Sequence, residues 1–148
     1  MKIFKTYTDL LEYVDQNDCA IVSEDTPLLV ELSVQENLSL ILKYHEKISV
    51  KKADILIKEL LKDMGLGKLC DKKPFELNKL EKVSIQLIRA YISPFEKICI
   101  IKPFSMLNRV EDLSHIITLS EKFDKKEVSV LDTHLHNFYK ESRCLTIR

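Results

Sequence analysis

The chain has 148 residues, 45% of them hydrophobic, with 23 basic and 23 acidic side chains; this composition fits one globular domain and shows no charge excess typical of a nucleic-acid surface. Only two residues are glycine, Gly65 and Gly67, and Lys68-Leu69-Cys70 follows them, which is neither a phosphate-binding loop nor a dinucleotide-binding fingerprint. No membrane span, signal-peptide core or paired-cysteine pattern is found, so we expect reduced thiols in a cytoplasmic protein.

The first predicted elements are a short strand within residues 1–5, a helix over residues 8–16 and a buried strand over Cys19–Val22. The helix is indicated by three apolar residues that share one side, and the strand by a short apolar run. The acidic stretch 23–32 around Pro27 is predicted to be a loop.

A mostly helical stretch follows, over about residues 33–93. Ser33 and Glu36 form a capping box that predicts a helix to about residue 44, and a second helix is predicted from Ser49. Gly65 falls where a left-handed helix cap is expected. Asn78 and Glu81 repeat the capping pattern before a helix that ends at Ser93-Pro94. Its apolar stripe predicts core packing.

The remaining chain alternates between strand and helix patterns. We predict strands over residues 98–101, Glu127–Asp132 and 144–147, with helices over 110–123 and 134–141. Such alternation is typical of right-handed crossovers and a parallel sheet. The expected fold class is therefore α/β, with a partial P-loop-NTPase-like parallel sheet flanked by helices and an inserted α-helical subdomain at about 33–93, in a single domain over 1–148.

The order of several short motifs adds to this interpretation. After the loop at 23–32 come Leu32–Leu38, then Met64–Leu69, then Pro74–Glu81, then Ile88-Arg89-Ala90, Pro103–Asn108 and finally Asp132-Thr133-His134. Taken together, this series resembles the ATP-binding-cassette (ABC) transporter ATPase domain, from just before its Q-loop to its last core strands. The individual motifs are weak, and their order and spacing carry the resemblance. It covers nearly all of this chain but only the later two-thirds or so of the family domain.

The resemblance assigns a set of motif positions, most of which depart from the family. The Q-loop glutamine position holds Ser23, and the signature loop corresponds to Leu77 followed by Asn78, Lys79, Leu80 and Glu81. The Walker B aspartate and the catalytic glutamate correspond to Ile101 and Lys102, and the D-loop aspartate to Asn108. The Walker A segment has no counterpart. Among these positions only His134, at the switch histidine, matches its motif.

These departures imply loss of nucleotide chemistry. In the family, backbone N–H groups of the signature loop approach a phosphate, and Lys79 and Leu80 place side chains there, while Glu81 adds negative charge. An isoleucine at position 101 cannot coordinate Mg²⁺. We therefore expect a truncated, degenerate ABC-ATPase-like subunit that acts by binding rather than by catalysis, with no catalytic residue and no cofactor. A metal site formed by His134, His136 and Cys144 is disfavoured, because positions i and i+2 do not share a helix face.

Partners implied by the resemblance are an intact ABC ATPase subunit, a permease subunit near the 23–31 loop, or a second copy of this chain. None of these requires nucleic acid or direct membrane insertion, and the expected location is cytoplasmic, at the inner face of the membrane through a partner. Two alternatives stay open. The chain contributes to a composite site for ATP and Mg²⁺ with an intact subunit, or it is a gene remnant or interaction module with no transporter role.

The missing Walker A strand poses a structural question. Without it, the strands near residues 128–131 and 144–147 lack their usual neighbour, and an unpaired strand edge is a liability. The sequence predicts one of three solutions: direct pairing of these two strands, a rearranged N-terminal strand, or shielding in a dimer.

Overall fold

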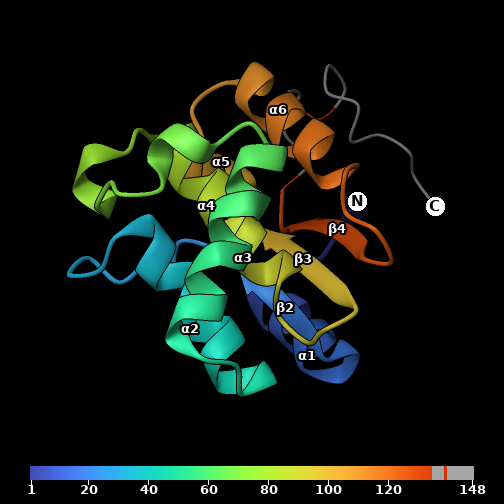
Figure 1. The fold of residues 1–148 in the computed structure, drawn as a ribbon. Helices are drawn as coiled ribbons and strands as arrows, with labels where there is room; N and C mark the ends of the chain where they lie inside the picture. Colours follow the sequence, from blue (N-terminus) through green and yellow to red (C-terminus); the bar gives the residue numbers. More distant parts are fainter. Residues whose placement is uncertain (135–138, 140–148) are drawn as a thin grey trace.

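The computed structural model describes residues 1–134 and 139 (Figure 1). Helices and strands alternate at the two ends of the chain, and the middle is helical. In chain order the elements are β1 (Lys2–Ile3), α1 (Tyr7–Asn17), β2 (Cys19–Val22), α2 (Val34–Glu46), α3 (Val50–Asp63), the 3₁₀ turns η1 (Gly67–Leu69) and η2 (Pro74–Glu76), α4 (Lys79–Tyr91), β3 (Lys97–Ile101), α5 (Pro103–Met106), α6 (Val110–Ser120) and β4 (Glu127–Asp132).

The four strands form one parallel sheet in the order β1-β4-β3-β2. Side chains alternate between its two faces. Ile98 and Ile100 of β3 point into the main core, which the helices of the central and C-terminal segments cover. Cys99 and Ile101 point to the opposite face, where Leu10 and other apolar residues of α1 pack. The predicted α/β class with a parallel sheet is confirmed.

The helical segment between β2 and β3 contains no strand among its described residues. Its predicted caps are present: Ser33, Ser49 and Asn78 each accept a hydrogen bond from a backbone N–H of the first turn. Gly65 has φ +77°, and the Leu66 N–H reaches back to the Leu61 carbonyl at 2.7 Å. This bond is typical of a Schellman helix end, which is why glycine is suited to that position.

The edge of β4 is covered by the N-terminal strand. Lys2 pairs with Leu131 and Ile3 with Asp132, and the Phe4 N–H donates to the Asp132 carbonyl at 2.9 Å. Of the three predicted solutions for this edge, the rearranged N-terminal strand is confirmed for β4. The predicted helix over 134–141 and the predicted strand over 144–147 lie outside the described residues, apart from His134 and Tyr139.

Three short elements were not predicted. These are η1, η2 and α5, each of three or four residues. They are too short to show a helical period, and proline at the first position of η2 and α5 was the only local signal. Lys102, immediately before α5, adopts a left-handed backbone with φ +46°, which reverses the chain sharply after β3.

Cys99 allows a prediction about pH. Burial, followed by the neighbouring Cys19 thiol, raises the pKa of Cys99 far above its ordinary value. A raised pKa in the folded state stabilises the protein below the unfolded pKa of about 8.5, and that stabilisation is lost as the pH rises further. Between pH 8.5 and 10.5 the free energy of unfolding should therefore fall more steeply in the wild type than in Cys99→Ala, by up to about 1.4 kcal/mol per pH unit.

Denaturant unfolding at several pH values measures this difference. Parallel pH dependences of the two proteins would contradict the assigned burial of the thiol. Alkylation gives an independent check, since Cys99 is 2% exposed and should react only when the chain unfolds.

Candidate functional site

The carboxyl ends of the strands gather at one edge of the sheet, because all four strands are parallel. This is the edge at which open α/β sheets bind ligands. The segments that leave it are residues 4–6 after β1, the loop starting at Ser23 after β2, Lys102 after β3, and Thr133-His134 after β4. Three of the predicted motif positions, Ser23, Lys102 and His134, therefore lie one or two residues after strands at this edge.

Ser23 closes the turn that follows β2. It is 5% exposed. Its backbone N–H donates to Thr26 Oγ1 at 3.1 Å, and its hydroxyl oxygen accepts from the Asp25 N–H at 3.2 Å. The Thr26 N–H in turn donates to the Ser23 carbonyl at 3.2 Å. The polar atoms of Ser23 thus serve the turn itself.

Two side chains of α4 hold the same turn. Gln86 Nε2 donates to the carbonyl of Thr26 at 3.0 Å and to that of Ser23 at 3.4 Å. The Arg89 guanidinium donates to the carbonyls of Thr26 and Pro27, the latter at 2.9 Å. Burial lowers the pKa of Arg89. We call these contacts the Gln86–Arg89 clamp. It fixes the loop after β2 against the helical segment.

At the end of β3, the position assigned to the Walker B aspartate and the position assigned to the catalytic glutamate lie in different environments. Ile101 is 4% exposed and packs in the apolar layer between α1 and the sheet. Lys102 leaves the sheet, and its ammonium lies 4.5 Å from the centre of the Tyr7 ring. The Tyr7 hydroxyl donates to Asp25 at 3.2 Å, and burial together with this carboxylate raises the pKa of Tyr7.

A cavity of about 300 Å³ opens at this point of the strand edge, lined by Tyr7, Ser23, Glu24, Asp25, Ile101, Lys102 and Ser105. Its lining brings together Ser23, Ile101 and Lys102, three of the predicted motif positions. The residues do not fit a Mg²⁺-nucleotide. Mg²⁺ takes oxygen ligands in octahedral geometry, whereas the end of β3 offers an aliphatic side chain and an ammonium, and two carboxylates on the lining would repel phosphates.

Asp132 organises the end of β4. It is 2% exposed, and its carboxylate accepts from the N–H of Thr133 at 2.7 Å, from the N–H of His134 at 3.2 Å and from the hydroxyl of buried Tyr139. The His134 side chain is exposed. The backbone of the switch position is thus held by the carboxylate two residues before it. Among the described residues no cluster of metal-ligating side chains is found.

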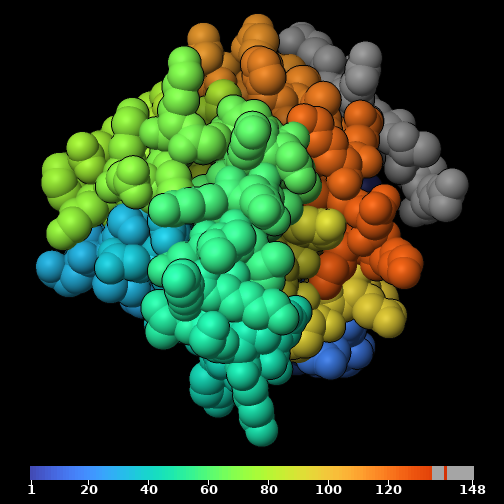
Figure 2. Space-filling view, viewed as in Figure 1, coloured from blue at the N-terminus to red at the C-terminus, as the bar shows by residue number. Residues whose placement is uncertain are grey.

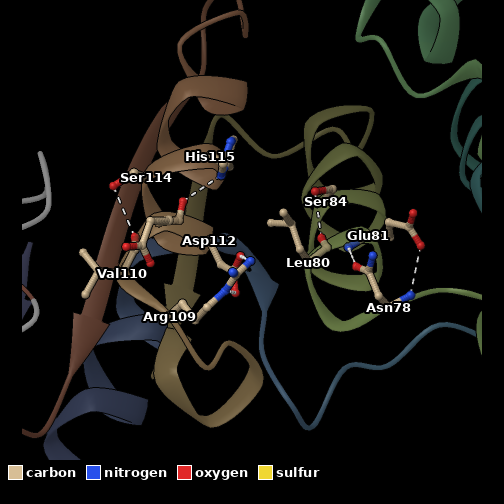
Figure 3. Close-up of polar contacts among 10 residues, drawn as sticks. Asn78, Leu80, Glu81, Ser84, Arg109, Val110, Asp112, Ser114 and His115 are labelled. Carbon is tan, nitrogen blue, oxygen red and sulfur yellow. Dashed lines mark hydrogen bonds and ion pairs between the residues drawn. The ribbon is translucent and has the colours of Figure 1, made fainter.

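The signature positions lie at the start of α4 (Figure 3). Asn78 Oδ1 accepts from the Glu81 N–H at 2.9 Å, and Glu81 Oε2 accepts from the Asn78 N–H at 2.9 Å. Lys79 Nζ donates to Asn108 Oδ1 at 3.1 Å, which joins the signature position to the D-loop position. Leu80 is partly buried against the core. The helix terminus that could receive an anion carries its own carboxylate instead.

Sequence reasoning missed several residues that shape this region: Tyr7, Gln86, Arg89, Asp132 and Tyr139. Gln86 and Arg89 lie among the apolar residues of α4. Arg89 belongs to the Ile88-Arg89-Ala90 motif, to which no function was assigned from the sequence. A polar residue within an apolar stripe could have indicated such contacts, because a buried polar side chain needs a hydrogen-bond partner elsewhere in the fold.

No family model matches the chain. The chain is 27% identical over 128 residues to the molybdate/tungstate import ATP-binding protein WtpC of Pyrococcus abyssi, covering 86% of this chain and 36% of that protein. Its fold is similar to that of MJ0796, a bacterial ABC transporter cassette whose dimeric structure is solved, with a TM-score of 0.62, 23% identity, and coverage of 93% of this chain and 61% of that one.

The fold is thus that of an ABC transporter cassette, with a parallel four-stranded sheet and flanking helices. In sequence the chain is similar to an ABC transporter ATP-binding protein. It spans about a third of the length of that curated relative. No helix in the described part of the chain is long and apolar enough to cross a bilayer.

Proposed function

We propose that this chain is a non-catalytic ABC-ATPase-like subunit that acts by binding other transporter components. The observation that carries the proposal is the carboxyl end of β3. The position that would need a Mg²⁺-binding carboxylate is Ile101, sealed in the apolar layer under α1, and the position that would need a general base is Lys102. An ammonium cannot take a proton from water in the way a carboxylate does.

The start of α4 supports the same proposal. Asn78 and Glu81 complete a capping box, so two of the N–H groups at the helix start, those of Asn78 and Glu81, already have side-chain partners. A phosphate arriving there would meet the Glu81 carboxylate. The role of this terminus is to hold the fold of the helical segment rather than to bind an anion.

The partners proposed are an intact ABC ATPase subunit, a permease subunit, or a second copy of this chain. One relative is an import ATP-binding protein, and one similar solved structure is described as dimeric. The loop after β2 is the proposed contact for a permease, because the Gln86–Arg89 clamp presents it in one conformation. A cytoplasmic location at the membrane, through such a partner, follows from this proposal.

Titration with ATP and Mg²⁺ tests the proposal. We expect no saturable heat in calorimetry and no phosphate release above that of buffer. Micromolar binding with turnover that disappears in His134→Ala would overturn it. An ABC ATPase of known activity, measured in the same assay, controls for reagent quality.

A composite ATP site is the competing function, and mixing separates the two. Asn78 is exposed, so the start of α4 can reach a partner. If the ATPase rate of an intact subunit rises when this chain is added, the composite site is supported and the non-catalytic proposal fails. The matched variant combines Lys79→Gly with Glu81→Gln, which removes the carboxylate and one side chain from the helix start. Stimulation by this variant alone would identify the Glu81 negative charge and the Lys79 side chain as the reason for inactivity.

A further inference from the structure

The connection between α2 and α3, over residues 43–52, has a composition unlike the rest of the chain. It carries four lysines and one glutamate, in a chain whose overall net charge is zero. The lysines are Lys43, Lys47, Lys51 and Lys52. The connection turns at one end of the molecule (Figure 1), and the space-filling view shows that this end projects from the body of the domain (Figure 2). We call residues 43–52 the basic tip.

Apolar side chains stand among these lysines. Tyr44 is 81% exposed and Val50 is 58% exposed. The ring of His45 lies edge-on to that of Tyr44, with the ring centres 5.1 Å apart. Exposed aromatic and aliphatic side chains between lysines are typical of segments that bind a membrane interface, where the ammonium groups meet headgroups and the apolar groups enter the acyl boundary.

The start of α3 departs from the pattern of the other helices of more than ten residues. Helices α1, α2, α4 and α6 all carry an acidic residue in the first turn, whereas α3 carries none. Its first turn holds Lys51 and Lys52, and cations are unfavourable beside the positive end of a helix dipole. Places where a chain breaks a local rule that it follows elsewhere are often functional. Lys43 is near the carboxylates of Glu36 and Asp54, but Lys51 and Lys52 stand at a helix start that favours an anion, so these two lysines are the ones that an external anion would stabilise.

We propose that the basic tip binds the surface of an anionic membrane. A bilayer offers many negative headgroups in a plane and an apolar layer just beneath, which matches lysines interspersed with Tyr44 and Val50 on a projecting end. An acidic peptide without apolar side chains would account for the lysines but leave the exposed tyrosine and valine without a counterpart. The contact is peripheral, and it is independent of any nucleotide chemistry at the strand edge.

The test uses the whole chain and two kinds of vesicle, phosphatidylcholine alone and phosphatidylcholine mixed in equal parts with phosphatidylglycerol. We expect sedimentation with the mixed vesicles only, weakening as salt is raised. The variant Lys51→Glu/Lys52→Glu should reduce the partition coefficient at least about tenfold. Its fold should be retained, because glutamates are favourable in the first turn of α3.

The matched control is Lys5→Glu/Lys122→Glu, which makes the same charge change at exposed lysines outside the tip. It should bind the mixed vesicles nearly as well as the wild type. Tyr44→Ser should also weaken binding, which an effect of charge alone would not produce. The proposal is overturned if the chain does not bind mixed vesicles, if both double variants lose binding equally, or if the tip variant loses binding to an acidic peptide but not to vesicles.

Discussion

Replacing Asp132 by alanine is expected to lower the free energy of unfolding by about 3 kcal/mol. The Asp132 carboxylate is 2% exposed and accepts hydrogen bonds from two backbone N–H groups and from the buried hydroxyl of Tyr139. Alanine removes the acceptor but leaves all three donors in place. A buried donor without a partner keeps the cost of its lost hydration, so the effect exceeds that of one ordinary hydrogen bond.

Two further variants separate these contributions. Asp132→Asn retains an acceptor oxygen and the shape of the side chain, so it should cost less than half as much as alanine. Tyr139→Phe removes one donor and leaves the carboxylate with its two backbone donors, which predicts a loss of about 1 kcal/mol. Urea unfolding of the four proteins measures the series. If Asp132→Ala and Tyr139→Phe have equal effects, the backbone contacts at Thr133 and His134 contribute nothing.

The elements that could be predicted from the sequence are those with two local signals. The helix starting after Asn78 combines a capping box with an apolar stripe, and both are present in the structure. The strand over Lys97–Ile101 is a short apolar run in an alternating strand–helix pattern, and it lies in the middle of the sheet. Signals of this kind lie within a few neighbouring residues, so they can be detected in a single sequence.

Contacts between distant segments could not be predicted in this way. That β1 pairs with β4 depends on which strand reaches an open edge, and the sequence left three solutions for that edge. The link between Lys79 and Asn108 joins two motif positions 29 residues apart, and no periodicity encodes it. The Ile101 and Lys102 substitutions were visible in the sequence, but the burial of Ile101 under α1 required the packing of the fold.

Replacing Arg89 by alanine should be the second large effect, lowering the free energy of unfolding by about 2 kcal/mol. Arg89 donates to the carbonyls of Thr26 and Pro27 across 62 or 63 residues of sequence. A planar guanidinium can serve two adjacent carbonyls at once, whereas an ammonium cannot match that fork. Arg89→Lys should therefore recover only part of the loss, although it keeps the charge.

The Gln86–Arg89 clamp also predicts which part of the molecule loses protection from hydrogen exchange when Arg89 is replaced. Amide hydrogen exchange at Ser23, Asp25 and Thr26 should become faster in Arg89→Ala, because Gln86 alone then holds the loop to α4. Combining Arg89→Ala with Gln86→Leu should raise exchange further, while β3 remains protected. Arg109→Ala is the matched control. It removes an exposed arginine that pairs with the buried carboxylate of Asp112 on α6 and makes no contact with the loop in the structure, so it should leave the exchange of the loop unchanged.

These exchange rates bear on the proposed binding role. A loop held at three carbonyls by one helix has few conformations to lose when a partner docks, so clamping lowers the entropic cost of association. If the loop exchanges as fast in the wild type as in the double variant, the loop is not held in solution. The strand edge would then offer a partner no fixed surface at this point, and the proposed permease contact would have to lie elsewhere on the domain.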